Sequence, residues 1–392
     1  MRPPRKKPRF SGNSAVLILS LLLCAAAAIK APASGLLPAA GMPPTAGSAP
    51  RNSAPGASGA EGSDLGLARG AAPPVPQGSE SLTPPQAPRA LGTAGIILLA
   101  HGGTPPWEDE VLKLKRALKG AYPTAVAFGM ADSHTIQQAI DELSKENVNR
   151  LIVVPLFVCS HSSIIEHTRY VLGLRSNPST ELMRDLRRME RAGHAHSISM
   201  ERIRTRLPLV LTPALDSHPL AAEIILDRAK ALSREPGRET LFLIGHGPVS
   251  ESDNRRWLDV MSRLGKGINA LARRRNLQPF KKIISGTLRD DAPAAVKERA
   301  RGLLRAQLRA AGKTSRVIVV PCLIARGGVE SHIGEALKGL PYLWSGETFA
   351  PHPNLERWVM EMAREAERSE SRRRDDPASA DFQDAAPPAE KL

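Results

Sequence analysis

Two short stretches of the sequence end an apolar run with a histidine and a glycine. They read Gly-Ile-Ile-Leu-Leu-Ala-His-Gly-Gly, which contains His101, and Thr-Leu-Phe-Leu-Ile-Gly-His-Gly-Pro, which contains His246. A short, continuously apolar run is typical of a buried parallel strand. Because ligands of open α/β sheets bind beside the carboxyl ends of the strands, each stretch predicts one imidazole at a ligand-binding edge.

A second pair of histidines follows a second pair of apolar runs. Residues 151–158 contain Val-Val-Pro and precede His161, and residues 316–324 repeat Val-Val-Pro before His332. A neutral imidazole can bind a divalent metal ion, or it can accept a proton while another imidazole holds the metal. Two histidines are too few for a closed zinc site, so a bound metal would keep open positions. We therefore predict four metal-binding histidines, with His101 and His161 as the principal pair and His246 and His332 as the second.

Small residues next to these histidines are the candidate ligand-binding positions. Gly102 and Gly103 let a ligand approach the backbone closely, although plain turn formation explains them equally well. Ser160 directly precedes His161 and is the third such position. The alternative for His101 is a structural histidine whose ring nitrogens bond to the loop backbone, and its recurrence at His246 favours a functional role. No glycine-rich phosphate loop or zinc-protease motif is present, which leaves nucleotide-dependent chemistry without support.

The elements around the histidines follow one pattern twice. Each half begins with a strand that ends in a histidine, continues with alternating helices and strands, and closes with a His-Pro pair that opens a helix. Such alternation predicts a parallel sheet flanked by helices, and four landmarks in the same order indicate an internal duplication. We therefore predict an α/β fold with two tandem modules, residues 93–235 and residues 236–367.

The two ends of the chain have a different composition. Residues 1–33 combine a basic head with a run of about 15 apolar residues, as a signal peptide or N-terminal membrane anchor does. Residues 34–92 are rich in Pro, Ala and Gly and predict a disordered linker, and residues 368–392 predict a disordered tail. We expect an exported or membrane-tethered protein; the alternative is a cytoplasmic protein with a misassigned start.

The positive net charge of the chain does not indicate a nucleic-acid-binding protein. The formal net charge is +15, yet the basic clusters are not interleaved with aromatic residues, which make up 4% of the chain. A surface that stacks bases would combine the two, so no nucleic-acid partner is predicted. Three cysteines form no disulfide framework, and we expect Cys159 and Cys322 to be buried as small apolar residues.

The order of the motifs resembles the CbiX/SirB-type sirohydrochlorin chelatases, which are ATP-independent class II chelatases related to protoporphyrin ferrochelatase. The matching features are the strand–His–Gly unit, the Val-Val-Pro-Leu-Phe strand and the histidine that follows it. The second half contributes Gly-His-Gly-Pro-Val-Ser-Glu-Ser-Asp-Asn-Arg-Arg-Trp and the ending Leu-Pro-Tyr-Leu…Pro-His-Pro. The resemblance spans about residues 94–365. One departure is Cys159-Ser160, which replaces the family's glycine-containing loop before the second histidine.

The resemblance implies two chelatase-like modules that face each other across a cleft, where a tetrapyrrole and a divalent metal substrate (Co²⁺, Fe²⁺ or Ni²⁺) meet. His101 and His161 would then be the metal-binding and proton-accepting pair, and no nucleotide would be needed. The expected activity is that of a lyase that inserts metal into a sirohydrochlorin-like macrocycle. The alternatives are an exported protein that binds metal or tetrapyrrole without turnover, and a fold that has lost its sites. The oligomeric state is left open.

Overall fold

The computed structural model describes residues 93–375, apart from residues 181, 185–186 and 188–198. These described residues belong to one compact unit. The predicted leader, the predicted linker and the last 17 residues of the predicted tail, 376–392, lie outside the described residues.

The first half contains a four-stranded parallel sheet in the order β2-β1-β3-β4. Its two inner strands, β1 and β3, are buried along their whole length, which explains why their sequences are apolar without alternation. The elements in chain order are β1 (Ala94–Ala100), α2 (Pro105–Leu118), β2 (Thr124–Phe128), α3 (Ser133–Leu143), β3 (Arg150–Pro155), α4 (Ser163–Val171) and β4 (Leu209–Leu211).

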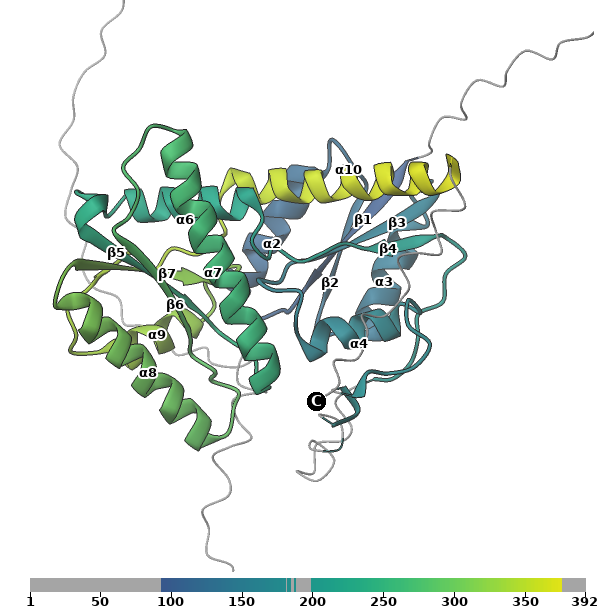
Figure 1. Cartoon of the computed structure of the whole chain (residues 1–392). Helices are drawn as coiled ribbons and strands as arrows, with labels where there is room; N and C mark the ends of the chain where they lie inside the picture. Colours follow the sequence, from purple (N-terminus) through teal and green to yellow (C-terminus); the bar gives the residue numbers. More distant parts are fainter. Residues whose placement is uncertain (1–92, 181, 185–186, 188–198, 376–392) are drawn as a thin grey trace, which may run out of the picture. The chain divides into compact units, whose positions relative to one another are not determined.

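The second half repeats this sheet in the equivalent order β6-β5-β7-β8, again with every neighbouring pair parallel. The identical strand order confirms the predicted fold class, with two duplicated parallel sheets flanked by helices (Figure 1). The elements are the 3₁₀ turn η2 (Pro236–Arg238), β5 (Glu239–Gly245), α7 (Glu251–Arg274), β6 (Lys282–Thr287), α8 (Ala294–Gly312), β7 (Arg316–Cys322), α9 (Val329–Leu337) and β8 (Leu343–Trp344).

Two helices are exchanged between the halves. Helix α6 (Pro219–Lys230) follows the first sheet in sequence but packs against β7 and α7 of the second half. Helix α10 (Pro353–Asp375) follows the second sheet but packs against β3 and α2, and Figure 1 shows it running along the first sheet. The two helices also contact each other, so one buried apolar core continues from one sheet to the other. The predicted boundary between residues 235 and 236 stays a prediction. The halves share this core, and each half also has a smaller apolar core formed by its own residues.

The far end of α10 is anchored to the first sheet. The Arg150 side chain, 2% exposed at the start of β3, forms an ion pair of 3.2 Å with Glu370. The Tyr122 hydroxyl donates a hydrogen bond of 3.0 Å to Glu367, and burial together with this carboxylate raises the pKa of Tyr122 to about 12. The prediction that the disordered tail begins at residue 368 is therefore wrong up to Asp375, because this segment is helical.

The exchanged helices begin with a reciprocal pair of histidines. His218 precedes α6, where its Nδ1 accepts a hydrogen bond from the Leu220 amide (3.2 Å), and its Nε2 lies 3.6 Å from Glu361 of α10. His352 precedes α10, and its Nε2 lies 3.5 Å from Asp227 of α6. Burial lowers the pKa of both histidines, and nearby Arg228 lowers that of His352 further, against the opposite effect of the acidic neighbours.

This pairing predicts a loss of stability in acid. A histidine with a folded-state pKa below its usual value of 6.5 contributes stability above that pH, and the contribution disappears as the pH falls through the folded-state pKa. The free energy of unfolding, measured with urea, should therefore be lower at about pH 5.5 than at about pH 7.5. The variant His218→Asn/His352→Asn keeps a capping side chain that cannot titrate, so its pH dependence should be shallower. An unchanged slope in this variant would exclude the two histidines as the cause.

Both expected buried cysteines are confirmed. Cys159 and Cys322 are buried and free, and burial raises the pKa of each thiol to about 12. Within the described ranges, no helix has the length and apolar character needed to span a membrane.

Candidate metal-binding site

The two histidines of the principal pair lie at the carboxyl ends of neighbouring strands. β1 and β3 pair directly, with Leu99 opposite Pro155, so the segments carrying His101 and His161 leave the same edge of the sheet. Both side chains are exposed. The His101 Nδ1–H donates to the Gly102 carbonyl (2.9 Å), which makes Nε2 the nitrogen that can bind a metal or accept a proton. Their position at this edge agrees with the prediction, whereas their role as ligands remains a prediction.

The glycines that follow His101 and His246 have a backbone conformation that favours glycine. Gly102 has φ +80° and Gly247 has φ +78°, the left-handed region that other residues avoid. A Cβ at Gly247 would also lie 2.5 Å from the Thr287 Cβ. The Gly103 amide donates to the Glu108 carboxylate at 3.1 Å. Turn formation therefore accounts for Gly102, and the ligand-binding roles of Gly102 and Gly103 stay predictions.

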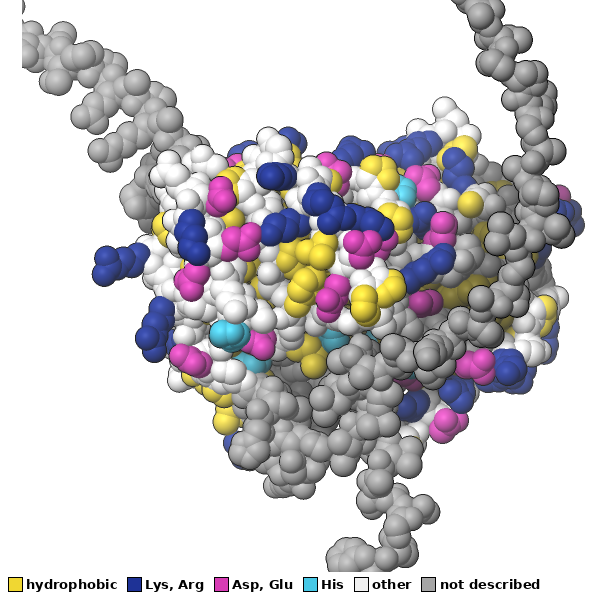
Figure 2. Space-filling model, turned by 180° about the vertical axis from the view of Figure 1, so that it is seen from behind, with side chains coloured by type: hydrophobic (Ala, Val, Ile, Leu, Met, Phe, Trp, Pro, Cys, Tyr) yellow, Lys and Arg dark blue, Asp and Glu magenta, His cyan; other side chains and the backbone are white. Residues whose placement is uncertain are grey.

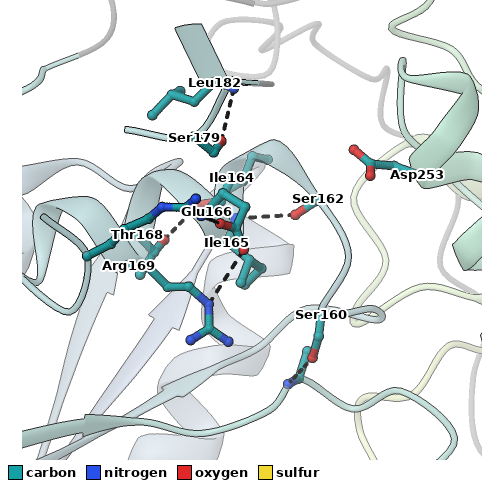
Figure 3. Close-up of polar contacts among 12 residues, drawn as sticks. Ser160, Ser162, Ile164, Ile165, Glu166, Thr168, Arg169, Ser179, Leu182 and Asp253 are labelled. Carbon is teal, nitrogen blue, oxygen red and sulfur yellow. Dashed lines mark hydrogen bonds and ion pairs between the residues drawn. The ribbon is translucent and has the colours of Figure 1, made fainter. Parts of the chain in front are cut away.

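Ser160 ties the loop of His161 to the loop that follows β4. Its amide donates to Asp216 Oδ1 (2.8 Å) and its hydroxyl donates to Asp216 Oδ2 (2.6 Å). The same hydroxyl accepts a hydrogen bond of 2.9 Å from the Ala214 amide. Figure 3 shows Ser160 in this loop, Ser162 at the start of α4, and Asp253 on a helix of the second half. The structure thus gives Ser160 a role in fixing the loop, and its predicted contact with a ligand remains a prediction.

Two consecutive aspartates lie next to the second pair of histidines. His332 Nδ1 lies 2.7 Å from Asp290 Oδ2, and His246 Nε2 lies 3.5 Å from Asp291 Oδ2. A carboxylate on one ring nitrogen fixes the tautomer and orientation of an imidazole and leaves the other nitrogen for a ligand, as is common among metal-binding histidines. Figure 2 shows histidine side chains next to acidic ones on the surface. Sequence reasoning missed both aspartates, although Asp-Asp shortly after a predicted strand was an available signal.

Arg289 organises the loop of His246. It has φ +59° and is 7% exposed. Its guanidinium donates to the carbonyls of Pro248 (3.2 Å) and Val249 (2.7 Å), and it pairs with Glu251 at 2.5 Å. Its own amide donates to the His246 carbonyl at 2.6 Å. These bonds join Arg289 to one segment, residues 246–251, which is distant in sequence. No local pattern therefore indicated this residue.

The second histidine of the second half lies in the first turn of a helix. The Glu330 carboxylate accepts hydrogen bonds from the amides of Gly327 (3.1 Å) and Gly328 (3.0 Å), which orders the loop before α9. His332 follows two residues later in this helix. Across the described residues, no group of three or more His, Cys, Asp and Glu side chains could hold a metal ion. Each half therefore offers two imidazoles rather than a complete set of ligands.

Comparison with known proteins finds similarity in the first half of the molecule. Residues 95–232 match the family model CbiX. The sirohydrochlorin cobaltochelatase of Methanothermobacter thermautotrophicus is 27% identical over 143 residues, which is 35% of this chain and 91% of that protein. Through this region the chain is similar to the CbiX/SirB family of class II chelatases, at the level of distant homology. The resemblance predicted from the motifs is thereby confirmed.

Two solved structures show a more remote likeness. SirB from Bacillus subtilis with Fe³⁺ has 16% identity and a TM-score of 0.46, covering 70% of this chain and 95% of that one. CbiX, described as the terminal enzyme for biosynthesis of sirohaem in denitrifying bacteria, has 15% identity and a TM-score of 0.41, with 70% and 99% coverage.

Proposed function

We propose that this protein inserts a divalent metal ion into a sirohydrochlorin-like tetrapyrrole without nucleotide hydrolysis. The observation that carries the proposal is the placement of His101 in the half that matches the CbiX model. Its imidazole is exposed at the end of β1, with Nδ1–H bonded to the Gly102 carbonyl. That hydrogen bond leaves the Nε2 lone pair available for the chemistry, and His161 lies at the end of the neighbouring strand.

The reaction requires a metal that is held weakly and a base close to the macrocycle. Insertion releases two pyrrole N–H protons, and a neutral imidazole can accept one of them as a general base. In the proposed arrangement one imidazole of the His101–His161 pair presents the metal ion, and the other accepts a proton and passes it to solvent. Co²⁺, Fe²⁺ and Ni²⁺ are the candidate metal substrates, since imidazole binds all three.

The second pair, His246 and His332, is proposed as a further metal-binding site. Asp290 and Asp291 contact these imidazoles, so they would add negative charge that attracts a cation and would orient the free ring nitrogens. The corresponding imidazole of the first half, His101, bonds to a neutral carbonyl instead. The two sites are therefore expected to differ in affinity, with the stronger cation binding in the second half.

Replacing Asp290 tests this second site. In a His101→Ala/His161→Ala background, Asp290→Asn should weaken Co²⁺ binding about 10- to 100-fold, the usual effect of removing a carboxylate that orients a metal-binding histidine. Isothermal titration with CoCl₂ measures the change. The matched control is Asp141→Asn, which alters an exposed aspartate on α3 that accepts a hydrogen bond from Gln137. Equal affinities for the two variants would contradict the assignment.

The activity itself is tested by following the visible spectrum of metal-free sirohydrochlorin. With Co²⁺, Fe²⁺ or Ni²⁺ and without nucleotide, the protein should accelerate the spectral change beyond the uncatalysed rate for at least one of the three metals. Rates equal to the protein-free reaction for all three metals would reject the proposed activity. The alternative function is binding of metal or tetrapyrrole without turnover. In that case the amount of tetrapyrrole whose spectrum changes would not exceed the molar amount of protein present.

We further propose export or membrane tethering through residues 1–33, on the strength of their basic and apolar segments. N-terminal sequencing of the protein from its native cell and fractionation of that cell test this proposal. An intact N-terminus in the soluble cytoplasmic fraction would favour the cytoplasmic alternative.

A further inference from the structure

Two tryptophans each contact one histidine-bearing loop from each half of the molecule. Trp107 lies in α2, six residues after His101, and is 9% exposed. Its side chain packs against Gly103, where an added Cβ would lie 3.5 Å from the Trp107 Cγ. It also packs against Gly327 of the second half, where an added Cβ would lie 2.8 Å from the Trp107 Cδ1. Gly327 belongs to the loop that leads to His332.

Trp257 makes the same connection with the halves reversed. It lies in α7, and its ring packs against Gly245, where an added Cβ would lie 3.3 Å from the Trp257 Cζ3. Gly245 directly precedes His246. The Trp257 Nε1–H then donates a hydrogen bond of 2.9 Å to the carbonyl of His161, which belongs to the first half.

A second residue of α7 borders the same loop. Asp253, one helical turn before Trp257 and therefore on the same helix face, is 5% exposed. Figure 3 shows its side chain pointing from α7 toward the segment of Ser162 that leads into α4. Ser160 fixes this loop from the side of the first half through Asp216. The backbone of His161 is thus held between its own half and α7 of the other half.

We propose that Trp257 is a positioning residue for His161, and that Trp107 supports the His332 loop in the same manner. This inference rests on one part of the proposed function, namely that the histidines in these loops bind metal. An indole is rigid, so a contact on each side transmits its position from one loop to the other. The His161 loop is therefore not held by residues 95–232 alone, the part of the chain that matches CbiX. One hydrogen-bond donor to this loop is the indole N–H of Trp257, which lies outside that part.

The test is the variant Trp257→Phe in the full chain, with Co²⁺ alone as the probe. The variant removes the N–H donor but keeps a ring against Gly245. In a His246→Ala/His332→Ala background, which isolates the first pair, Co²⁺ affinity should fall about 3- to 10-fold, the range expected for one lost hydrogen bond. The matched control is Trp344→Phe, which alters a partly buried tryptophan of β8 whose ring packs edge-on against Tyr342. It should change the affinity less than twofold.

A double-mutant comparison separates positioning from a general structural effect. If Trp257 acts through His161, adding Trp257→Phe to His161→Ala should cause no further loss of Co²⁺ affinity. Any change in melting temperature should be the same in both backgrounds, because the lost hydrogen bond to the carbonyl of residue 161 is the same. A further loss in the His161→Ala background, or an equal loss in Trp344→Phe, would overturn the inference. Because this titration needs no tetrapyrrole, it stands or falls separately from the insertion activity. Protein that binds Co²⁺ in this pattern but inserts no metal would reject only the proposed function.

Discussion

Replacing His101 and His161 together by alanine is expected to lower kcat/KM for metal insertion about 10²- to 10⁴-fold, the contribution typical of a general acid–base group. Both side chains are exposed, and the bond made by the His101 ring is to its own neighbour, Gly102. The free energy of unfolding should therefore change by no more than about 0.5 kcal/mol, as for other surface substitutions. Initial rates from the sirohydrochlorin spectrum and urea titrations measure the two effects.

The control for this variant is His134→Ala. His134 is an exposed histidine in the first turn of α3, where its ring contacts Gln138 at 3.1 Å. It should leave the insertion rate unchanged, since it lies on a helix and not at the end of β1 or β3. A comparable loss of insertion rate in His134→Ala would show that the effect is not specific to His101 and His161.

Replacing Trp358 by alanine is expected to destabilise the protein by about 3–5 kcal/mol, the usual cost of removing a large aromatic side chain from a core. Trp358 is fully buried in α10, in the core that continues from one sheet to the other. Because α10 packs against β3, the damage should extend to the first sheet even though residue 358 follows the second. Urea unfolding measures the stability, and amide hydrogen exchange in β3 measures the spread.

The matched variant is Trp358→Phe. The Trp358 Nε1–H is buried and lacks a hydrogen-bond partner within the described residues, so phenylalanine loses volume but also removes an unsatisfied donor. A smaller loss is therefore expected, below about 1.5 kcal/mol, as for moderate changes of shape in a core. The contradicting result would be unchanged amide exchange in β3 together with faster exchange in β7 after Trp358→Ala. The shared core would then not couple the stability of the two sheets.

The parts of the fold that the sequence could predict are those encoded locally. Buried parallel strands need continuous apolar runs, so residues 95–100 and 240–245 were recognisable as strands, within one residue of the observed β1 and β5. Their recurrence revealed the duplication. The exchange of α6 and α10 could not be predicted, because an apolar helix face does not specify which sheet it will cover. The helical continuation to Asp375 was missed for a similar reason. Its charged residues resemble a solvated tail, and the buried partner of Glu370, Arg150, is 220 residues away.

The residues of the candidate site also fall into those that the sequence could predict and those that it could not. The histidines could be located because each follows a strand at a predictable sheet edge. Their partners could not, since Asp216, Asp290 and Trp257 reach the histidine loops from other segments of the chain. The family match covers residues 95–232 and carries no information on contacts made by the second half. The supports of the His161 loop became visible only when both halves were seen together.

The most direct test of the proposed function is the amount of product formed per protein molecule. A limiting quantity of the full chain is incubated with excess metal-free sirohydrochlorin and the metal substrate that gives the fastest spectral change. Metallated tetrapyrrole is then quantified after separation from the protein. The proposal predicts many molecules of product per molecule of protein, and about one or fewer for His101→Ala/His161→Ala. A yield that stops at one per molecule of wild-type protein would contradict catalysis and leave a protein that binds its ligand without turnover.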